Sequence, residues 1–435
     1  MALGGGTYVA QNKILPGAYI NFVSQPRAMG TLGERGTVCM AVELDWGSSG
    51  MICVEAGAFQ TEAKSIFGYE YTHEKMKPLR DLFLYAKKAL LYRCNSGQKA
   101  TATAGGCNIE AKYGGTRGND IRIIISKNID DETAFDVKTY LDLKLEDTQT
   151  VKKIEDLTEN TYVTFQGTGS LEANAGVNLT GGTNKEVTGS DYSDFLEEAE
   201  KENFNVLAYA GEDNTTKGLF TAFTKRLRDE EGIKFVTVLF DYTKADFEGI
   251  ISVTNETEEE KTALVYWTAG IEAGAEVNES VTNKKYDGEY TIKAKYKKSR
   301  FIEGIQKGEF LYYEDGEDIR VLRDINTFTS FESSKNSDFS SNRVVRVLDA
   351  IANDVARIFS QYYLGKQSNN ANGRNLLKAE LIQYHEQLQA IEAIEGFIPE
   401  DITISQGVEK QDVVVYEKVR PTDAMEKLYM KVEVI

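Results

Sequence analysis

From Leu428 onward, the end of the chain alternates between apolar and polar side chains, as a half-buried strand does. The apolar positions would share one face of this strand: Leu428, Met430, Val432 and Val434. The backbone of such a strand needs partners, because an unpaired apolar edge invites association with another chain. The partner is either the edge of the chain's own sheet or a sheet of a neighbouring subunit, and the pattern leaves both open.

A second short strand is predicted near the start of the chain, after a turn at Leu15-Pro16-Gly17. Its residues are Ala18, Tyr19, Ile20, Asn21, Phe22 and Val23. Both ends of the chain are thus predicted to be strands that lie outside any helical layer. A chain with such a strand at each end is suited to an open, repeating assembly rather than to a closed dimer.

Between the ends, two stretches alternate between strand-like and helix-like apolar spacing. The predicted strands are residues 37–46, 51–54, 89–93, 204–210, 233–240 and 250–253. The predicted helices are residues 59–67, 74–88, 190–199 with Ser190 as the capping residue, 214–231 and 259–270. Such an alternation predicts an α/β core with a mostly parallel sheet and helices on both of its faces.

The pattern changes between residues 96 and 184, where short strands are separated by Gly, Asn and Asp. Examples are residues 121–125, 134–141 and 162–166. Several short strands at this spacing predict a small antiparallel sandwich or barrel. We interpret this region as an all-β domain inserted into the α/β core.

The C-terminal third predicts two long helices flanked by strands. The expected elements are strand-prone residues 284–313, a hairpin at 312–319 that turns at Asp315-Gly316, a strand at 321–328, helices at 342–364 and 374–394, and strands at 401–405 and 412–419. The predicted organisation is an N-terminal arm (1–25), two core segments (26–95 and 185–320) around the insertion (96–184), a C-terminal domain (321–419) and a C-terminal arm (420–435).

The charge balance argues against nucleic-acid binding. The 435 residues include 50 Lys and Arg against 68 Asp and Glu, which gives a formal net charge of −18. Neutralising phosphates requires clustered cations in excess. We therefore expect no direct nucleic-acid partner.

The sequence contains no apolar run long enough to span a bilayer and no signal-peptide layout at its start. We therefore expect that the chain folds in a cytoplasm and does not bind a membrane. The four cysteines form no Cys-x-x-Cys pair and are expected to be reduced: Cys39, Cys53, Cys94 and Cys107.

Catalytic chemistry finds little support. The chain has two histidines, His73 and His385, which leaves few candidates for a general base or a metal centre. The glycine cluster at residues 114–118 precedes a strand, whereas a phosphate-binding loop opens a helix. We expect no catalytic residue, no cofactor and no metal. The alternative from another class is a cytoplasmic α/β enzyme with an inserted β domain and an active site at the carboxyl ends of its strands.

Several segments carry a family resemblance: Val321–Phe328, Asn342–Asp349, Tyr363–Lys366 with Asn372–Arg374, Pro421–Met430, and the Pro-Gly-Ala-Tyr run within Leu15–Asn21. On these residues the chain resembles the contractile tail sheath proteins of myophages, prophages and phage-tail-like bacteriocins. The likeness is strong from Val321 onward, moderate over the α/β part and weak across the inserted region. It is greatest to the short sheaths of Gram-positive defective prophages and related bacteriocins.

The resemblance implies a structural subunit of a contractile injection system. Such sheaths stack as hexameric rings in a helical array around an inner tube, and contraction drives the tube through a target cell envelope. Each subunit lends terminal strands to sheets of its neighbours, so residues 18–22 and 428–434 would be lent strands, and the edge near 401–419 would receive them. The insertion at 96–184 would face outward.

The resemblance also implies partners and a location. The expected partners are further copies of the chain, the inner tail tube protein, and baseplate and tail terminator proteins. Assembly is expected in the bacterial host cytoplasm, and the product would be a virion tail or a released extracellular tail-like particle. A tail tube or another baseplate component is a further alternative, which the chain length and the two-helix C-terminal layout disfavour.

Three arginines on the predicted helix 342–364 are candidates for gripping the tube: Arg343, Arg346 and Arg357. The alternative for each is an ordinary solvated or intramolecular ion pair.

Overall fold

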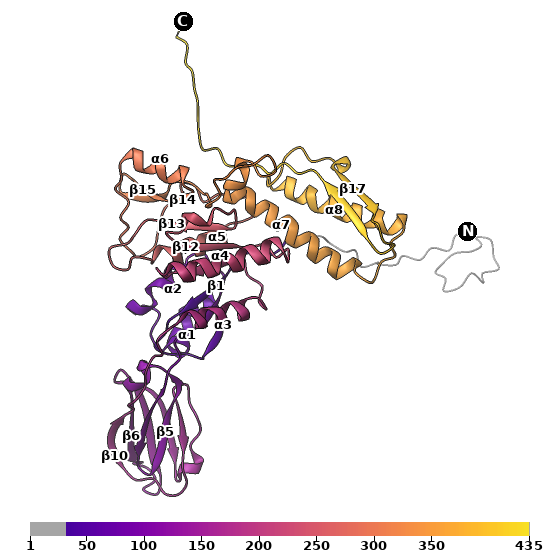
Figure 1. Ribbon diagram of the computed structural model, residues 1–435. Helices are drawn as coiled ribbons and strands as arrows, with labels where there is room; N and C mark the ends of the chain where they lie inside the picture. Colours follow the sequence, from indigo (N-terminus) through magenta and orange to yellow (C-terminus); the bar gives the residue numbers. More distant parts are fainter. Residues whose placement is uncertain (1–31, 435) are drawn as a thin grey trace, which may run out of the picture. The chain divides into compact units, whose positions relative to one another are not determined.

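A computed structural model describes residues 32–434 (Figure 1). The chain divides into two compact units. The larger unit contains residues 33–353, 388–396 and 419–434, and the smaller unit contains residues 354–387 and 397–418 together with Leu32. The predicted N-terminal strand at residues 18–23 lies outside the described residues.

The larger unit is built on a seven-stranded sheet. Its strands, in their order across the sheet, are β14 (Glu309–Phe310), β13 (Ile250–Val253), β12 (Val236–Phe240), β11 (Val206–Tyr209), β1 (Thr37–Val42), β3 (Lys88–Arg93) and β2 (Gly50–Glu55). Every neighbouring pair is parallel except β2 with β3. The β/α alternation therefore predicted the mostly parallel sheet correctly.

Helices cover both faces of this sheet. Alternate residues of a strand point to opposite sides, so strands that are apolar throughout must be covered on both faces. One face packs against α1 (Ala56–Phe67), α2 (Lys77–Phe83) and α5 (Leu264–Gly274). The other face packs against α3 (Gly189–Ala199) and α4 (Asn214–Asp229). On β1, Val38 and Met40 belong to the first core and Cys39 to the second, and all three are fully buried.

Residues 99–178 form two small antiparallel sheets, as the sequence predicted for the insertion. One contains β10 (Asn174–Asn178), β6 (Ile121–Lys127), β7 (Phe135–Leu141) and β8 (Lys144–Val151), and the other contains β4 (Lys99–Ala104), β5 (Cys107–Gly114) and β9 (Val163–Gln166). Both contribute to one apolar core, to which Ile109 and Val163 belong from one sheet and Ile123 and Val137 from the other.

The carboxylate of Asp45 joins this β region to the α/β core of the larger unit. It accepts hydrogen bonds from Thr116 Oγ1 at 3.2 Å, in the turn between β5 and β6, and from Asn184 Nδ2 at 2.8 Å, after the last strand of the β region. From the α/β core it accepts a hydrogen bond from Tyr69 Oη at 2.9 Å and pairs with Lys75. Burial alone would raise the pKa of Asp45, but these donors lower it to about 2.

The rest of the larger unit contains α6 (Lys298–Gln306), the hairpin of β15 (Tyr312–Asp315) and β16 (Asp318–Val321), and the first part of α7 (Asn342–Ile358). The hairpin turns where the sequence predicted it, and Gly316 takes the left-handed conformation that such a turn requires, with φ of 65°. A helical turn of the π type follows α7 at Phe359–Tyr363.

Four expectations for this unit were wrong. The strand-prone stretch 284–313 contains the helix α6, and residues 321–328 form a loop after Val321. The helix predicted at 74–88 is shorter, because a 3₁₀ turn at Glu74–Met76 precedes α2 and α2 ends at Phe83. The capping residue of α3 is Thr188 rather than Ser190, and its backbone N–H donates to Asp191 at 2.8 Å.

The smaller unit contains most of α8 (Ala371–Ala390) and a two-stranded antiparallel sheet of β17 (Ile402–Gln406) and β18 (Val413–Glu417). Leu377, Leu381 and Tyr384 of α8 are buried. The Tyr384 hydroxyl donates to Asp354 Oδ2 at 2.9 Å, which ties α8 to the last turns of α7 within this unit.

Candidate functional site

The C-terminal segment is attached to the larger unit at its beginning. The backbone N–H of Glu395 donates to the carbonyl of Arg420 at 2.9 Å, and the N–H of Thr422 donates to the carbonyl of Ala393 at 3.0 Å. These two bonds form a short antiparallel bridge between the segment and the loop after α8. The direction in which the segment leaves the larger unit is therefore set by backbone hydrogen bonds.

Side chains strengthen this attachment. Nη2 of Arg343 donates to Thr422 Oγ1 at 3.0 Å and to the carbonyl of Glu392 at 3.3 Å. Farther along, Glu426 accepts hydrogen bonds from Arg323 Nε at 2.6 Å and from Thr282 Oγ1 at 3.1 Å. These contacts fix residues 420–426 to the larger unit, and we call this segment the anchored root.

Beyond Glu426 the described segment is extended and bonds only to itself, through the ion pair between Lys431 and Glu433. Its apolar side chains are largely exposed: Leu428 87%, Met430 75%, Val432 69% and Val434 94%. The strand expected here is not paired within residues 32–434, and which sheet receives it stays a prediction. We call residues 427–434 the free segment.

The hairpin β17–β18 of the smaller unit has open edges. Its five residue pairs run from Ile402 with Glu417 to Gln406 with Val413, and no third strand joins it in the described part of the chain. Val414, Val415 and Tyr416 are 50%, 37% and 60% exposed. A two-stranded sheet is marginal in water by itself, so both edges are available to further strands.

Arg346, one of the three arginines expected to grip the tube, is buried and therefore not available to a tube surface. Its side chain is 3% exposed and pairs with Glu272 at 2.6 Å and Asp324 at 3.6 Å. Nη1 also donates to the carbonyl of Glu279. Arg346 therefore serves as the central cation of a buried charge cluster in the larger unit.

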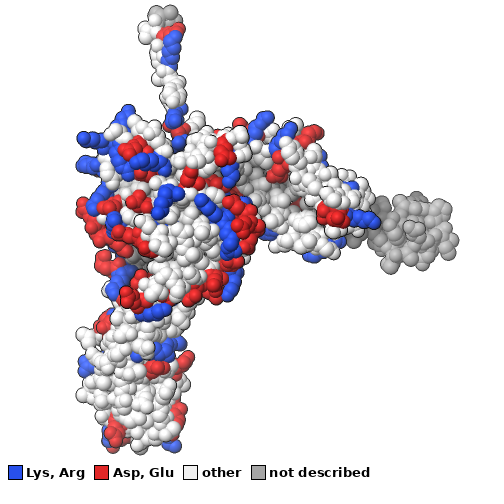
Figure 2. Space-filling model, in the orientation of Figure 1, with Lys and Arg blue, Asp and Glu red and all other residues white. Residues whose placement is uncertain are grey.

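The other two arginines are partly exposed. Arg343 holds the anchored root, and Arg357 pairs with Asp354 at 2.9 Å with 31% of its side chain exposed. Their expected contact with a tube stays a prediction. On the face drawn in Figure 2, basic side chains lie among acidic ones rather than in one continuous basic surface.

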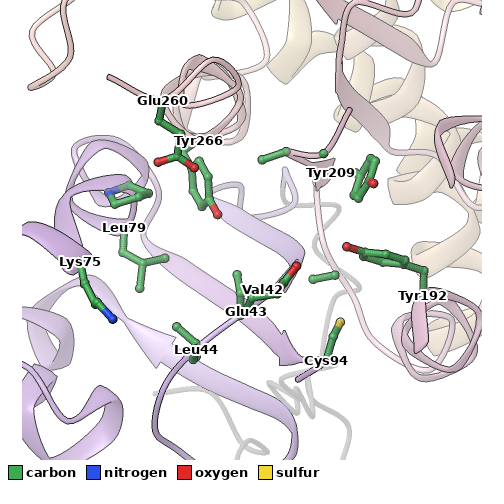
Figure 3. A pocket seen from close by; sticks show the side chains of 14 residues that line it. Val42, Glu43, Leu44, Lys75, Leu79, Cys94, Tyr192, Tyr209, Glu260 and Tyr266 are labelled. Atoms are coloured by element: carbon green, nitrogen blue, oxygen red, sulfur yellow. The ribbon is translucent and has the colours of Figure 1, made fainter. Parts of the chain in front are cut away.

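A cavity of about 320 Å³ opens at the carboxyl ends of three neighbouring parallel strands (Figure 3). It lies after Val42 of β1, after Arg93 of β3 and after Tyr209 of β11. This is the point where the strand order reverses, since the chain builds outward from β1 on one side and from β11 on the other. Crevices at such switch points bind ligands in many α/β proteins.

The histidines contribute nothing to this cavity. His73 lies in the turn before α2, where its Nδ1 accepts the backbone N–H of Lys75 at 3.2 Å. His385 is fully buried in the smaller unit, with Nδ1 2.8 Å from the carbonyl oxygen of Leu381 and its ring stacked on Phe397. Nε2 of His385 lies 3.5 Å from Oε2 of Glu417.

Among residues 32–434, no group of three or more His, Cys, Asp or Glu side chains is placed to hold a metal ion. Within the same residues, no helix has the length and apolar character needed to cross a bilayer.

Three family models match the chain. A phage tail sheath protein beta-sandwich domain matches residues 95–184, a phage tail sheath protein central domain matches residues 185–327, and a phage tail sheath C-terminal domain matches residues 334–435. The chain is 37% identical over 468 residues to the phage-like element PBSX protein XkdK of Bacillus subtilis (strain 168), which covers 99% of this chain and 100% of the relative.

Solved structures show the same fold. A sheath tail protein from Desulfitobacterium hafniense is 43% identical, with a TM-score of 0.86 over 96% of this chain and 99% of that chain. The helical sheath of the anti-feeding prophage in its contracted state is 11% identical, with a TM-score of 0.59 over 97% of this chain and 99% of that chain. The second likeness is one of fold alone.

Proposed function

Because the chain belongs to the phage tail sheath family, we propose that it polymerises as stacked hexameric rings around an inner tube and contracts to drive that tube through a target cell envelope. Its role in this proposal is structural, without a catalytic site. The observation that carries the proposal is the free segment, an alternating strand sequence that has an anchored root and no partner in its own described chain.

The free segment supports strand donation on physical grounds. Four apolar side chains on one face gain about 1.5–3 kcal/mol each when they are fully buried, and none of them is buried in the single chain. Its backbone N–H and C=O groups would gain ladder partners in the same step. The anchored root limits the directions that the segment can take, which reduces the entropy lost when a neighbour binds it.

The hairpin β17–β18 is the receiving site in this proposal. Its exposed valines provide an apolar surface, and its two open edges provide the backbone partners. In the proposed assembly, one edge takes the free segment of one neighbour, and the other takes residues 18–22 of another. Because each subunit both gives and receives strands, the contacts propagate as an open array.

The remaining parts have proposed places in the particle. The α/β core with its long helices lies nearer the tube, and the β domain at residues 96–184 faces outward. Contraction repacks rigid bodies while the segments that join the lent strands absorb the rotation. The proposed partners are further copies of the chain, the inner tube protein, and baseplate and terminator proteins. We place assembly in the bacterial host cytoplasm and the product in a virion tail or a released particle.

Paired variants of the free segment test this function. Met430→Ser with Val432→Ser removes apolar side chains from one face, and Lys431→Ser with Glu433→Ser alters the opposite face as the control. Negative-stain images should show long tubes for the wild type and the control, and dispersed subunits for the M430S/V432S chain. Tubes of normal length from M430S/V432S would contradict the proposal.

A further inference from the structure

The cavity at the switch point of the sheet has walls rich in tyrosine. Tyr192 comes from α3, Tyr209 from the end of β11 and Tyr266 from α5. The rings of Tyr192 and Tyr209 meet edge to face, with centroids 5.1 Å apart. A volume of about 320 Å³ with aromatic walls and a few polar groups falls within the range of small-molecule sites.

Backbone geometry supports the shape of this cavity. A Cβ atom at Gly211 would lie 2.1 Å from the hydroxyl oxygen of Tyr209 and 2.2 Å from its Cζ atom. Any larger residue at position 211 would therefore displace the Tyr209 ring. The loop after β11 is thus fitted to the aromatic wall.

The carboxylate of Glu43 is the charged group of the cavity that has no partner among the described residues. It is exposed to water and has no hydrogen bond or ion pair among the described residues, whereas Lys75 is neutralised by Asp45 and Glu260 accepts a hydrogen bond from Tyr290 Oη at 3.5 Å. Figure 3 shows the hydroxyls of Tyr192 and Tyr266 pointing toward Glu43. Within this cavity the unbalanced charge is therefore negative.

The pKa values of three side chains that line the cavity reflect the negative charge of Glu43. Burial is the main cause that raises the pKa of Tyr192, Tyr266 and Cys94, and the negative charge of Glu43 adds to it in all three. The pKa of Cys94 rises to about 12. The phenols and the thiol are therefore neutral at ordinary pH.

An anionic ligand does not suit this site. The helix that follows β11 is α4, and its N-terminus is already occupied by the carboxylate of Asp213, which accepts the backbone N–H of Thr216 at 2.7 Å. A phosphate in the cavity would meet the carboxylates of Glu43 and Glu260. A cation, in contrast, would find a carboxylate, phenol oxygens as acceptors and the faces of tyrosine rings.

We propose that this cavity binds a small organic cation, an alkylammonium or a guanidinium group, with Glu43 as its ion-pair partner and Tyr192, Tyr209 and Tyr266 as its walls. The site is independent of strand donation. Two sources can supply this chemistry: a free polyamine-like molecule, or a Lys or Arg side chain of a neighbouring copy in the assembly.

Calorimetric titration with putrescine and with agmatine tests the site on the full-length chain. Saturable binding at one site per chain is expected, and E43Q should weaken it about tenfold, since one charge-assisted contact is lost. Y266F, which keeps the ring, should cause a smaller loss. The control is E258Q, an exposed glutamate outside the cavity, and it should bind as the wild type does.

Two forms of the chain distinguish the sources. If the ligand is a free cation, the wild-type polymer and the dispersed M430S/V432S chain should both bind putrescine. If a neighbour's side chain fills the cavity, only dispersed chains should bind it, and E43Q should slow polymerisation. The absence of saturable binding in both forms, or equal binding by E43Q and E258Q, would overturn the site. Polymerisation by M430S/V432S would contradict strand donation but not the cation site. The cation site is tested by comparing E43Q with E258Q, and that comparison does not require a dispersed chain.

Discussion

Nε of Arg323 donates a hydrogen bond to Oε2 of Glu426 at 2.6 Å, and Glu426 is the last residue of the described chain that bonds to the body of the larger unit. The anchored root therefore ends at this pair and the free segment begins after it. The side chains of Arg323 and Glu426 are 31% and 18% exposed, so water weakens the bond without abolishing it.

Removing this pair should separate assembly from stability. Arg323→Ala should lower the free energy of unfolding by less than about 1 kcal/mol, because a partly exposed ion pair contributes little. It should slow polymerisation roughly threefold to tenfold, since the free segment loses its preset direction. Light scattering measures the rate, and Lys431→Ala, which breaks the pair inside the free segment, is the control. An unchanged rate for R323A would show that the root does not position the strand.

The buried arginine should matter far more for stability. Arg346→Ala leaves the carboxylate of Asp324 buried without its cation and the carboxyl group of Glu272 without a hydrogen-bond donor, and breaking a buried ion pair in this way costs about 3–5 kcal/mol. Urea denaturation of R346A and of the partly exposed control Arg357→Ala gives the comparison. A loss below about 1 kcal/mol for R346A would contradict the role of this cluster in holding α7 to α5.

The same cluster predicts a pH dependence. Burial, with Asp324 nearby, raises the pKa of Glu272 above its ordinary value of 4.5. The folded chain thus holds a proton that the unfolded chain releases, so this stabilisation is complete below pH 4.5 and is lost as pH rises through the folded pKa. The free energy of unfolding should fall over this range in the wild type and vary less in Glu272→Gln. Equal slopes for the two chains would contradict the prediction.

Asp45 should act in the opposite direction. Its pKa is lowered from 3.8 to about 2, so its contribution is present above pH 3.8 and is lost as pH falls toward 2. Asp45→Asn should therefore lose stability at pH 6 and should show a weaker dependence on pH between 4 and 2 than the wild type. Thermal unfolding at these pH values measures both. An acid transition identical in both chains would show that Asp45 does not hold the β region to the core.

The sequence predicted the elements whose information is local. The apolar run that became β12 had to be a covered central strand, and Asp315-Gly316 had to be a turn. Helix α6 was missed because it is short and has only one buried residue, Gly304. In the loop after β16, the N–H of Thr327 donates to the carbonyl of Ile250, a partner that no local pattern reveals.

The candidate sites were harder to predict from the sequence, because they depend on residues that are distant along the chain. The alternation at residues 428–434 was visible, but a strand pattern does not say which sheet receives it. Arg346 was expected on a surface because it is charged, and its partner Glu272 lies 74 positions earlier in the chain. The cavity was foreseen only within the enzyme alternative, as a site at the carboxyl ends of the strands, and the residues that follow β1, β3 and β11 were the signal that could have located it.

A cryo-electron microscopy map of the assembled polymer tests strand donation itself. We expect density for residues 428–434 to cross from one subunit to the next and to run beside β17 or β18 as an added strand. Density in which this segment folds back onto its own subunit throughout the polymer would contradict it.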